Sequence, residues 1–122
     1  MISVFYDGKC GLCSREIAFF KKRTPKNPIQ WFDVSRHPEH LEGTGLTQSD
    51  ALMFMRVRDA SGAMHSEVDA FIAMWGQFPG WIMIARLLSL SGVHFLAGLV
   101  YRRFAHYRFR KYPHCQASLG PA

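Results

Sequence analysis

The pattern of hydrophobic and polar positions predicts a strand, a helix and a second strand in the first third of the chain. Residues 2–6 are mostly apolar, with β-branched and aromatic side chains that suit a buried strand. An apolar stripe at helical spacing then runs through residues 13–22, and two prolines mark residues 24–28 as a loop. Residues 29–34 form the second predicted strand. This order predicts a right-handed β-α-β unit with parallel strands.

The next segment predicts a hairpin followed by a helix. Residues 35–47 are polar and irregular, with room for a short helix over residues 37–41. A third strand is predicted over residues 52–57 and a short return strand over residues 63–66, joined by a turn at Asp59-Ala60-Ser61-Gly62. Residues 69–78 have the apolar spacing of a helix, which Pro79-Gly80 ends. A β-α-β unit followed by β-β-α is the thioredoxin-like layout of an α/β fold.

Two further helices are predicted beyond this core. They cover residues 81–90 and 93–110, with Ser91-Gly92 between them. Read without a break, residues 81–101 have the length of a membrane span, but Arg86 and His94 lie inside this stretch. We therefore expect helices that pack on the core. The predicted organisation is one domain over residues 1–122, with a core (1–80), additional helices (81–112) and a tail (113–122).

Composition supports a packed single domain with few cysteines. The chain has 122 residues, of which 48% are hydrophobic, enough for one core. The first residues lack the basic region of a secretory signal, so we expect a cytoplasmic protein. Three cysteines in such a protein argue against a disulfide scaffold. They leave redox chemistry or metal binding as their use.

The net charge of +6 favours anionic partners without identifying one. Basic and aromatic residues alternate over residues 101–112, a pattern that suits nucleic acid or an anionic membrane face. No nucleic-acid-binding motif accompanies them. We therefore interpret this stretch as an amphipathic terminal helix with a solvated basic face, expect no nucleic-acid partner, and keep peripheral membrane contact as an alternative.

The two cysteines in Cys10-Gly11-Leu12-Cys13 lie where the first strand ends and the first helix begins. Unpaired N–H groups and the positive end of the peptide dipoles at a helix start stabilise a thiolate. We expect Cys10 at this start with an accessible sulfur, and Cys13 one turn later, able to close a disulfide with it. Asp7 is expected to cap the turn or to accept a cysteine proton, although its charge opposes thiolate formation.

The motif Tyr6-Asp7-Gly8-x-Cys10-x-x-Cys13 resembles the signature of the DCC family of small predicted thiol–disulfide oxidoreductases. Asp7, Cys10 and Cys13 match the residues that give this family its name. Asp69-Ala70-Phe71 and the stretch from Tyr101 to Arg108 are also similar to family members. The resemblance implies a thioredoxin-like fold and a redox function. Thioredoxins proper have a proline before the third strand, whereas Ser49-Asp50-Ala51 here has none, which argues against thioredoxin-style binding of substrate backbone.

Zinc is the main chemical alternative to redox use of the cysteines. Structural zinc needs four ligands, and Cys10 and Cys13 could be joined by His114 and Cys115. Adjacent ligands fit tetrahedral geometry poorly, and the sequence contains no second Cys-x-x-Cys. The sequence therefore favours redox chemistry over a metal site.

The third cysteine and three histidines remain without an assigned role. Cys115 is interpreted as an exposed tail residue, with a mixed disulfide to Cys10 or a partner as the alternative. His37, His40 and His65 fall in or near predicted loops, and any of them near Cys10 would raise its thiolate fraction. A solvated loop position is the simpler interpretation of each histidine.

These observations predict a thiol–disulfide oxidoreductase. Cys10 would attack a substrate disulfide and Cys13 would resolve the mixed disulfide. This chemistry needs no organic cofactor. It needs a disulfide-containing protein or a small thiol as substrate and an external reductant. The alternative is a non-catalytic binding module, with structural or zinc-binding cysteines and a basic aromatic helix that contacts a membrane or a partner.

Overall fold

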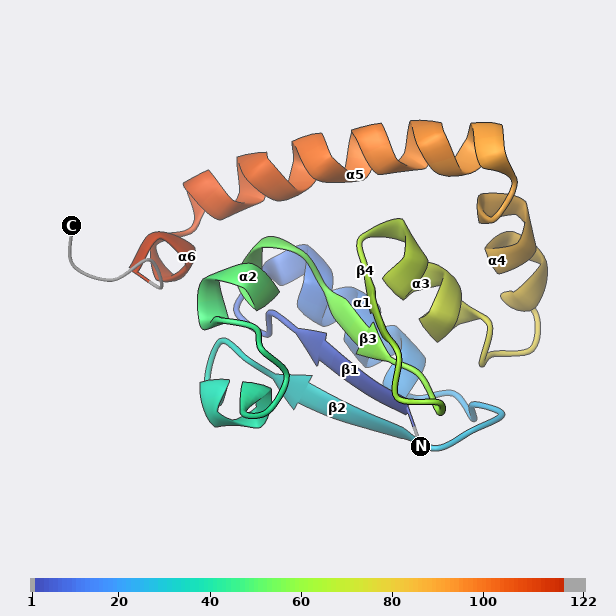
Figure 1. Ribbon diagram of the computed structural model, residues 1–122, viewed down its shortest axis with the longest axis horizontal. Coiled ribbons are helices and arrows are strands. Elements are labelled where there is room, and N and C mark those ends of the chain that lie inside the picture. The colour runs from blue at the N-terminus through green and yellow to red at the C-terminus, as the bar shows by residue number, and fades with distance from the viewer. Residues whose placement is uncertain (1, 118–122) are drawn as a thin grey trace.

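A four-stranded mixed sheet forms the centre of the protein in the computed structural model (Figure 1). The structure describes residues 2–117, apart from the side chains of Leu12, Gln116 and Ala117. The strands are β1 (Ile2–Tyr6), β2 (Ile29–Asp33), β3 (Arg56–Arg58) and β4 (Met64–Ser66), in the order β2-β1-β3-β4. Strand β1 is parallel to β2 and antiparallel to β3, and β4 is antiparallel to β3. This arrangement confirms the predicted thioredoxin-like α/β fold.

Helices cover both faces of the sheet, and the longest of them crosses one end of the molecule. They are η1 (Pro38–Leu41, a 3-10 helix), α1 (Gly11–Lys21), α2 (Gln48–Met53), α3 (Val68–Trp75), α4 (Ile82–Leu88), α5 (Ser91–Lys111) and α6 (Pro113–Ala117). Figure 1 shows α5 running across the top, with α4 turning down at one end and α6 lying beyond α2 at the other.

Alternate side chains of β1 point into two cores. Ile2, Val4 and Tyr6 share one core with buried side chains of α1 and α3, among them Ile17, Phe20, Ala70 and Met74. Phe5 points to the opposite face and shares the second core with residues of η1, α2, α5 and α6, among them Leu41, Leu52, Phe109 and Cys115. Burial on both faces explains why the residues of β1 are mostly apolar and do not alternate with exposed polar ones.

The structure places a helix where a strand was expected at residues 52–57. Helix α2 extends to Met53, and β3 begins only at Arg56. Thr47 and Asp50 form a capping box: the Thr47 hydroxyl accepts from Asp50 N at 3.2 Å, and Asp50 Oδ2 accepts from Thr47 N at 3.1 Å. These reciprocal bonds satisfy two N–H groups at the helix start, so the segment folds as a helix.

The expected tail also folds in part, because residues 113–117 form α6. Tyr112 is extended, with φ −90° and ψ 124°, as is typical of a residue before proline. This conformation ends α5 and turns the chain back toward the sheet. As a result Cys115 is fully buried in the second core, and its interpretation as an exposed tail residue is wrong.

The predicted packing of α4 and α5 on the core holds for one side of each helix. Ala85, Gly98, Ala105 and Phe109 are buried, whereas many other apolar side chains of the two helices are exposed. Within the described residues, no single helix combines the length and hydropathy needed to cross a membrane. Helices α4 and α5 meet that requirement only together, and they are bent by 91° where they meet.

Candidate active site

A tight turn after β1 carries Asp7 and fixes the start of α1. Asp7 Oδ1 accepts a hydrogen bond from Lys9 N at 3.0 Å, which matches the predicted capping of the turn. Gly8 N donates to Oδ1 of Asp33, the last residue of β2, at 2.9 Å. A Cβ atom at Gly8 would collide with the Asp33 carboxylate, so the close approach of the two strand ends requires glycine here.

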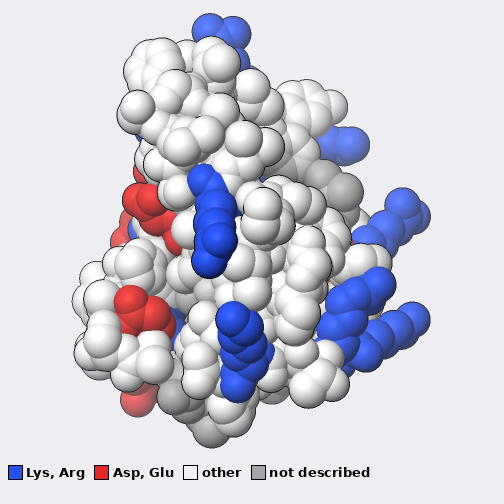
Figure 2. Space-filling model, turned by 90° about the vertical axis from the view of Figure 1, so that its right-hand side faces the viewer, with Lys and Arg blue, Asp and Glu red and all other residues white. Residues whose placement is uncertain are grey.

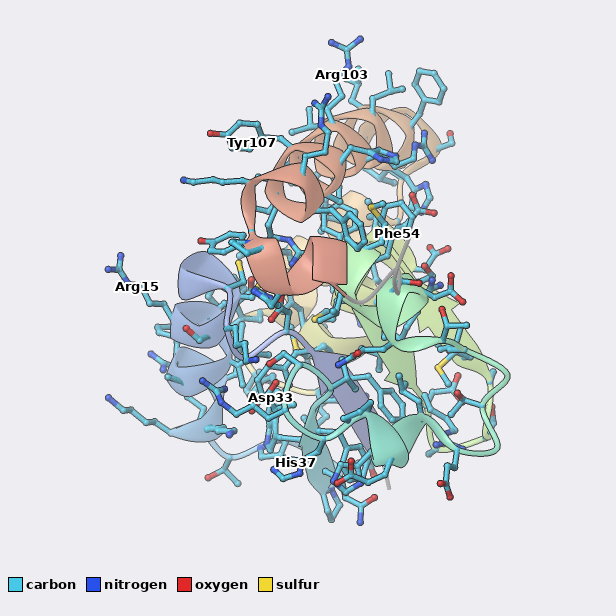
Figure 3. All side chains as sticks on the ribbon, turned by 90° about the vertical axis from the view of Figure 1, so that its left-hand side faces the viewer. Arg15, Asp33, His37, Phe54, Arg103 and Tyr107 are labelled. Carbon is cyan, nitrogen blue, oxygen red and sulfur yellow. The ribbon has the colours of Figure 1, made fainter. Side chains whose placement is uncertain are left out.

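The sequence did not identify Asp33 as part of this turn. Its carboxylate also accepts from the backbone and hydroxyl of Ser35 and pairs with Arg36. These donors lower the pKa of Asp33 although its burial opposes ionisation. Figure 3 shows Asp33 beneath the end of β1, whereas Arg15 of α1 points outward. Asp33 therefore supports the turn from below and does not contact the thiols.

Cys10 is the N-cap of α1, as the sequence predicted. Its sulfur accepts a hydrogen bond from Cys13 N at 3.5 Å. The two sulfurs are not joined in a disulfide. Cys10 is only 1% exposed, so the expectation of an accessible sulfur is wrong, and Cys13 is the partly exposed member of the pair.

The surroundings of the two sulfurs push their pKa values apart. A hydrogen bond from the Cys13 thiol has the largest effect on the pKa of Cys10 and lowers it. The Cys13 N–H and the charge of Arg108 also lower this pKa, whereas burial and the charge of Asp7 raise it. Together they lower the pKa of Cys10 to about 6. Donating that hydrogen bond and being partly buried both raise the pKa of Cys13. At neutral pH the arrangement therefore favours a thiolate at Cys10 and a thiol at Cys13.

Arg108 of α5 is the cation at this site. It is 5% exposed, and its Nη1 lies 2.9 Å from Asp7 Oδ2. Its Nη2 donates to the carbonyl oxygens of Leu52 and, at 3.0 Å, Met53 in the last turn of α2. The prediction that residues 101–112 present a solvated basic face is wrong for Arg108, which is buried. The guanidinium instead joins the Asp7 turn to the C-terminal end of α2.

Helix α6 brings two further side chains to Asp7. His114 Nε2 lies 2.9 and 2.8 Å from the two carboxylate oxygens, and Cys115 Sγ lies 3.6 Å from Oδ2. Burial and the nearby Asp7 charge raise the pKa of Cys115 to about 11, so this thiol stays protonated at neutral pH.

The histidines that the sequence offered as neighbours of Cys10 have other contacts. His37 and His40 form an exposed group with Glu39, and His65 Nε2 lies 2.7 Å from Asp59 Oδ2. His114, which the sequence proposed only as a zinc ligand, is instead the histidine that contacts the site.

The predicted zinc ligands are only partly brought together. Among the described residues, potential ligand atoms of Asp7, His114 and Cys115 lie within 4.8 Å of one another, a group that contains neither Cys10 nor Cys13. The same Asp7 carboxylate already pairs with the guanidinium of Arg108. A fixed positive charge at that distance opposes a divalent cation, so the structure fits a hydrogen-bonded network better than a metal centre.

A cavity of about 300 Å³ opens beside Cys13, between α5 and the body of the protein. Cys13, Asp7 and Arg108 line one part of it. The remaining wall is mostly apolar and comes from α1, α3, α5 and the approach to β3, including Ile17, Met55, Phe71, Trp75, Tyr101 and Phe104. The site thus combines two neighbouring thiols with an apolar pocket, which suits binding of an apolar group next to Cys13.

Comparison with protein families gives a match that contains the cysteine turn, the cavity-lining residues and Arg108, but not α6. A family model described as DCC1-like thiol-disulfide oxidoreductase matches residues 4–112, which include Asp7, Cys10, Cys13 and Arg108. Comparisons with curated proteins and with solved structures found no significant match. The family match covers most of the chain and confirms the resemblance seen in the sequence. The chain therefore belongs to the DCC1-like thiol-disulfide oxidoreductase family.

Proposed function

We propose that this protein carries out thiol–disulfide exchange with Cys10 as the attacking sulfur and Cys13 as the resolving sulfur. The observation that carries the proposal is the hydrogen bonding of Cys13 to Cys10 at the start of α1, which favours a thiolate on Cys10 alone. A thiol with a pKa near 6 is mostly ionised at neutral pH, and its thiolate is a better leaving group than that of an ordinary thiol.

The exchange proceeds in two balanced steps. The Cys10 thiolate attacks one sulfur of the substrate disulfide, forms a mixed disulfide and releases the other substrate sulfur as a thiolate, which takes up a proton. Cys13 then loses its proton and attacks the Cys10 sulfur, which releases the second substrate thiol. Two electrons pass to the substrate, and the Cys10–Cys13 disulfide remains. An external dithiol of the cytoplasm, the proposed location, reduces it again.

Asp7 has two proposed roles in this cycle. It holds the turn before Cys10 through Lys9 N and positions Arg108, whose charge favours the Cys10 thiolate. Its carboxylate raises the pKa of Cys10, so it opposes formation of the attacking thiolate. It also raises the pKa of Cys13, which therefore keeps its proton until the second step. We assign it the second step, in which the proton of Cys13 must move to an acceptor.

Access to the buried Cys10 sulfur sets a condition on the substrate. The cavity beside Cys13 offers an apolar approach to the pair, so we propose a disulfide flanked by apolar groups, in a protein or in a small molecule. A Cβ atom on Gly11 would lie 4.0 Å from Tyr112 Oη, so the Tyr112 hydroxyl lies near the start of α1.

Trapping of the intermediate tests this assignment. The Cys13→Ser substitution keeps a hydroxyl donor next to Cys10 but removes the resolving sulfur, so we expect a persistent mixed disulfide at Cys10 after incubation with a disulfide substrate. Combining it with Cys115→Ser excludes resolution by the third thiol. Mass spectrometry of the peptide that contains Cys10 measures the adduct. An adduct found only on Cys115 in the Cys13→Ser variant, or no adduct on Cys10 in the Cys13→Ser/Cys115→Ser variant, would overturn the proposed order of attack.

A further inference from the structure

The outer side of the α4–α5 pair is apolar, and neighbouring elements leave it exposed. Eight large hydrophobic side chains on it are between 40% and 69% exposed: Met83, Ile84, Leu87, Leu90, Phe95, Leu96, Leu99 and Val100. We call these residues the α4–α5 face. Exposure of this many large apolar side chains on two adjoining helices is unusual for a monomer that contacts only water, and it indicates an interaction surface.

Along α5 the α4–α5 face continues into a row of cations. Leu96, Leu99, Val100, Arg103 and Tyr107 recur at spacings of three and four residues, which places them on one side of the helix. Arg110 follows at the same spacing. The first half of this side is aliphatic, and the second half is aromatic and basic. Figure 3 shows Arg103 and Tyr107 pointing away from the body of the protein.

The charge of the chain is divided sharply between its two parts. Residues 1–69 contain nine basic and nine acidic residues, whereas residues 70–122 contain six basic and no acidic residues. The second part therefore supplies the whole net charge of +6. Arg108 is buried against Asp7, and the other five cations are exposed: Arg86, Arg102, Arg103, Arg110 and Lys111. In Figure 2, which looks at the α4 end, acidic side chains appear only on the left-hand side, whereas basic side chains occupy the centre and the right.

The apolar side chains and the excess of cations together fit an anionic lipid surface better than a second copy of this chain. A second copy of the chain would place like charges together, because a symmetric interface joins the same patch on both subunits. An in-plane amphipathic helix instead has apolar side chains on one side and Lys or Arg to contact anionic headgroups. The 91° bend between α4 and α5 agrees with a pair that lies along the surface.

We propose that the α4–α5 face docks on an anionic lipid bilayer, with its aliphatic side chains in the interface and the exposed arginines on the headgroups. The docked surface lies next to the thiol site. Ala97, Tyr101 and Phe104 line both a groove on α5 and the cavity that contains Cys13. Docking therefore holds this cavity close to the lipid surface. The proposal does not depend on redox activity of the cysteines.

Sedimentation with vesicles tests the proposal. The protein is expected to bind vesicles of phosphatidylcholine mixed with phosphatidylglycerol, to bind pure phosphatidylcholine weakly, and to dissociate as salt rises. The partition coefficient of the Arg103→Glu/Arg110→Glu variant should fall by a factor of about thirty or more. Each arginine near an anionic surface contributes roughly a factor of five, and the new glutamates are repelled by the surface. The Leu96→Gln/Val100→Gln variant should also bind less, because it removes apolar contact without a change in charge.

The matched control is Lys22→Glu/Lys26→Glu, which makes the same change in net charge on exposed residues outside the α4–α5 face. It should keep most of the vesicle binding. Equal loss in both charge variants would mean that net charge alone drives binding, and would overturn the assignment of this face. Failure to bind anionic vesicles at low salt would also overturn the proposal. So would a stable dimer that the Leu96→Gln/Val100→Gln substitutions dissociate.

Discussion

The Cys10→Ser variant is expected to reduce no substrate disulfide above the uncatalysed rate. A hydroxyl is a far weaker nucleophile than a thiolate and cannot form the mixed disulfide. The substitution should leave the fold intact, because serine is a preferred N-cap residue and its hydroxyl can accept the hydrogen bond from Cys13 N that the Cys10 sulfur accepts now. Turnover of a disulfide substrate with a dithiol as reductant measures the effect.

Two controls make this result specific. The unfolding curve of the reduced Cys10→Ser variant should agree with that of the reduced wild-type protein near pH 5.5, where the Cys10 thiolate adds little stability. The Cys13→Ser variant should also fail to turn over, but it should accumulate the mixed disulfide that Cys10→Ser cannot form. If Cys10→Ser keeps full turnover, the oxidoreductase assignment is wrong and the binding-module alternative gains support.

Replacing Arg108 with methionine is expected to lower the free energy of unfolding by about 3–5 kcal/mol, the usual effect of removing one partner from a buried ion pair. The Asp7 carboxylate, whose side chain is 2% exposed, would lose its guanidinium partner, and the carbonyls of Leu52 and Met53 would lose their donor. The pKa of Cys10 should rise in the same variant, because the charge of Arg108 helps to lower it. Urea unfolding and thiolate titration measure the two effects.

Arg103→Met is the matched control for this prediction, since Arg103 is an exposed arginine of the same helix (Figure 3). Its unfolding free energy should change by less than about 0.5 kcal/mol. The Arg108→Met/Asp7→Asn double variant should recover part of the lost stability, because no carboxylate remains buried without its partner. An Arg108→Met protein as stable as the wild type would show that the ion pair does not hold α5 to the cysteine turn.

Local sequence patterns were sufficient for the elements nearest the cysteines. The apolar run of β1, the Asp7-Gly8 turn and the stripe of α1 each depend on residues within a few positions, and the structure confirms them. Helix α2 was missed although its signal was present: Thr47 and Asp50 have capping-box spacing, and the apolar residues that follow read equally well as a strand.

The remainder of the site could not be predicted, because it joins parts of the chain that are far apart. Arg108, His114 and Cys115 contact Asp7 across 101, 107 and 108 positions. One signal could have identified Arg108: together with Tyr101 and Ala105 it recurs at helical spacing on the inner side of α5. The turn that directs α6 back to Asp7 depends on Tyr112 and Pro113 only in part, since its direction is set by packing against the second core.

The burial of Cys10 could not be predicted from its local sequence either, and it affects which measurement reports the ionisation of its thiol. Alkylation rates at a sulfur that is 1% exposed depend on opening of the structure as well as on ionisation. Ultraviolet absorbance of the thiolate reports ionisation without the need for a reagent to enter. The difference between reduced wild-type protein and the Cys10→Ser variant isolates the contribution of Cys10.

This difference titration, on reduced and metal-free protein, tests the central claim most directly. The account predicts that thiolate absorbance at Cys10 appears with a midpoint near pH 6, so that the group is protonated below that pH and ionised throughout the neutral range. A midpoint at or above about 8.5, the value of an ordinary thiol, would contradict an activated Cys10 and with it the proposed thiol–disulfide exchange.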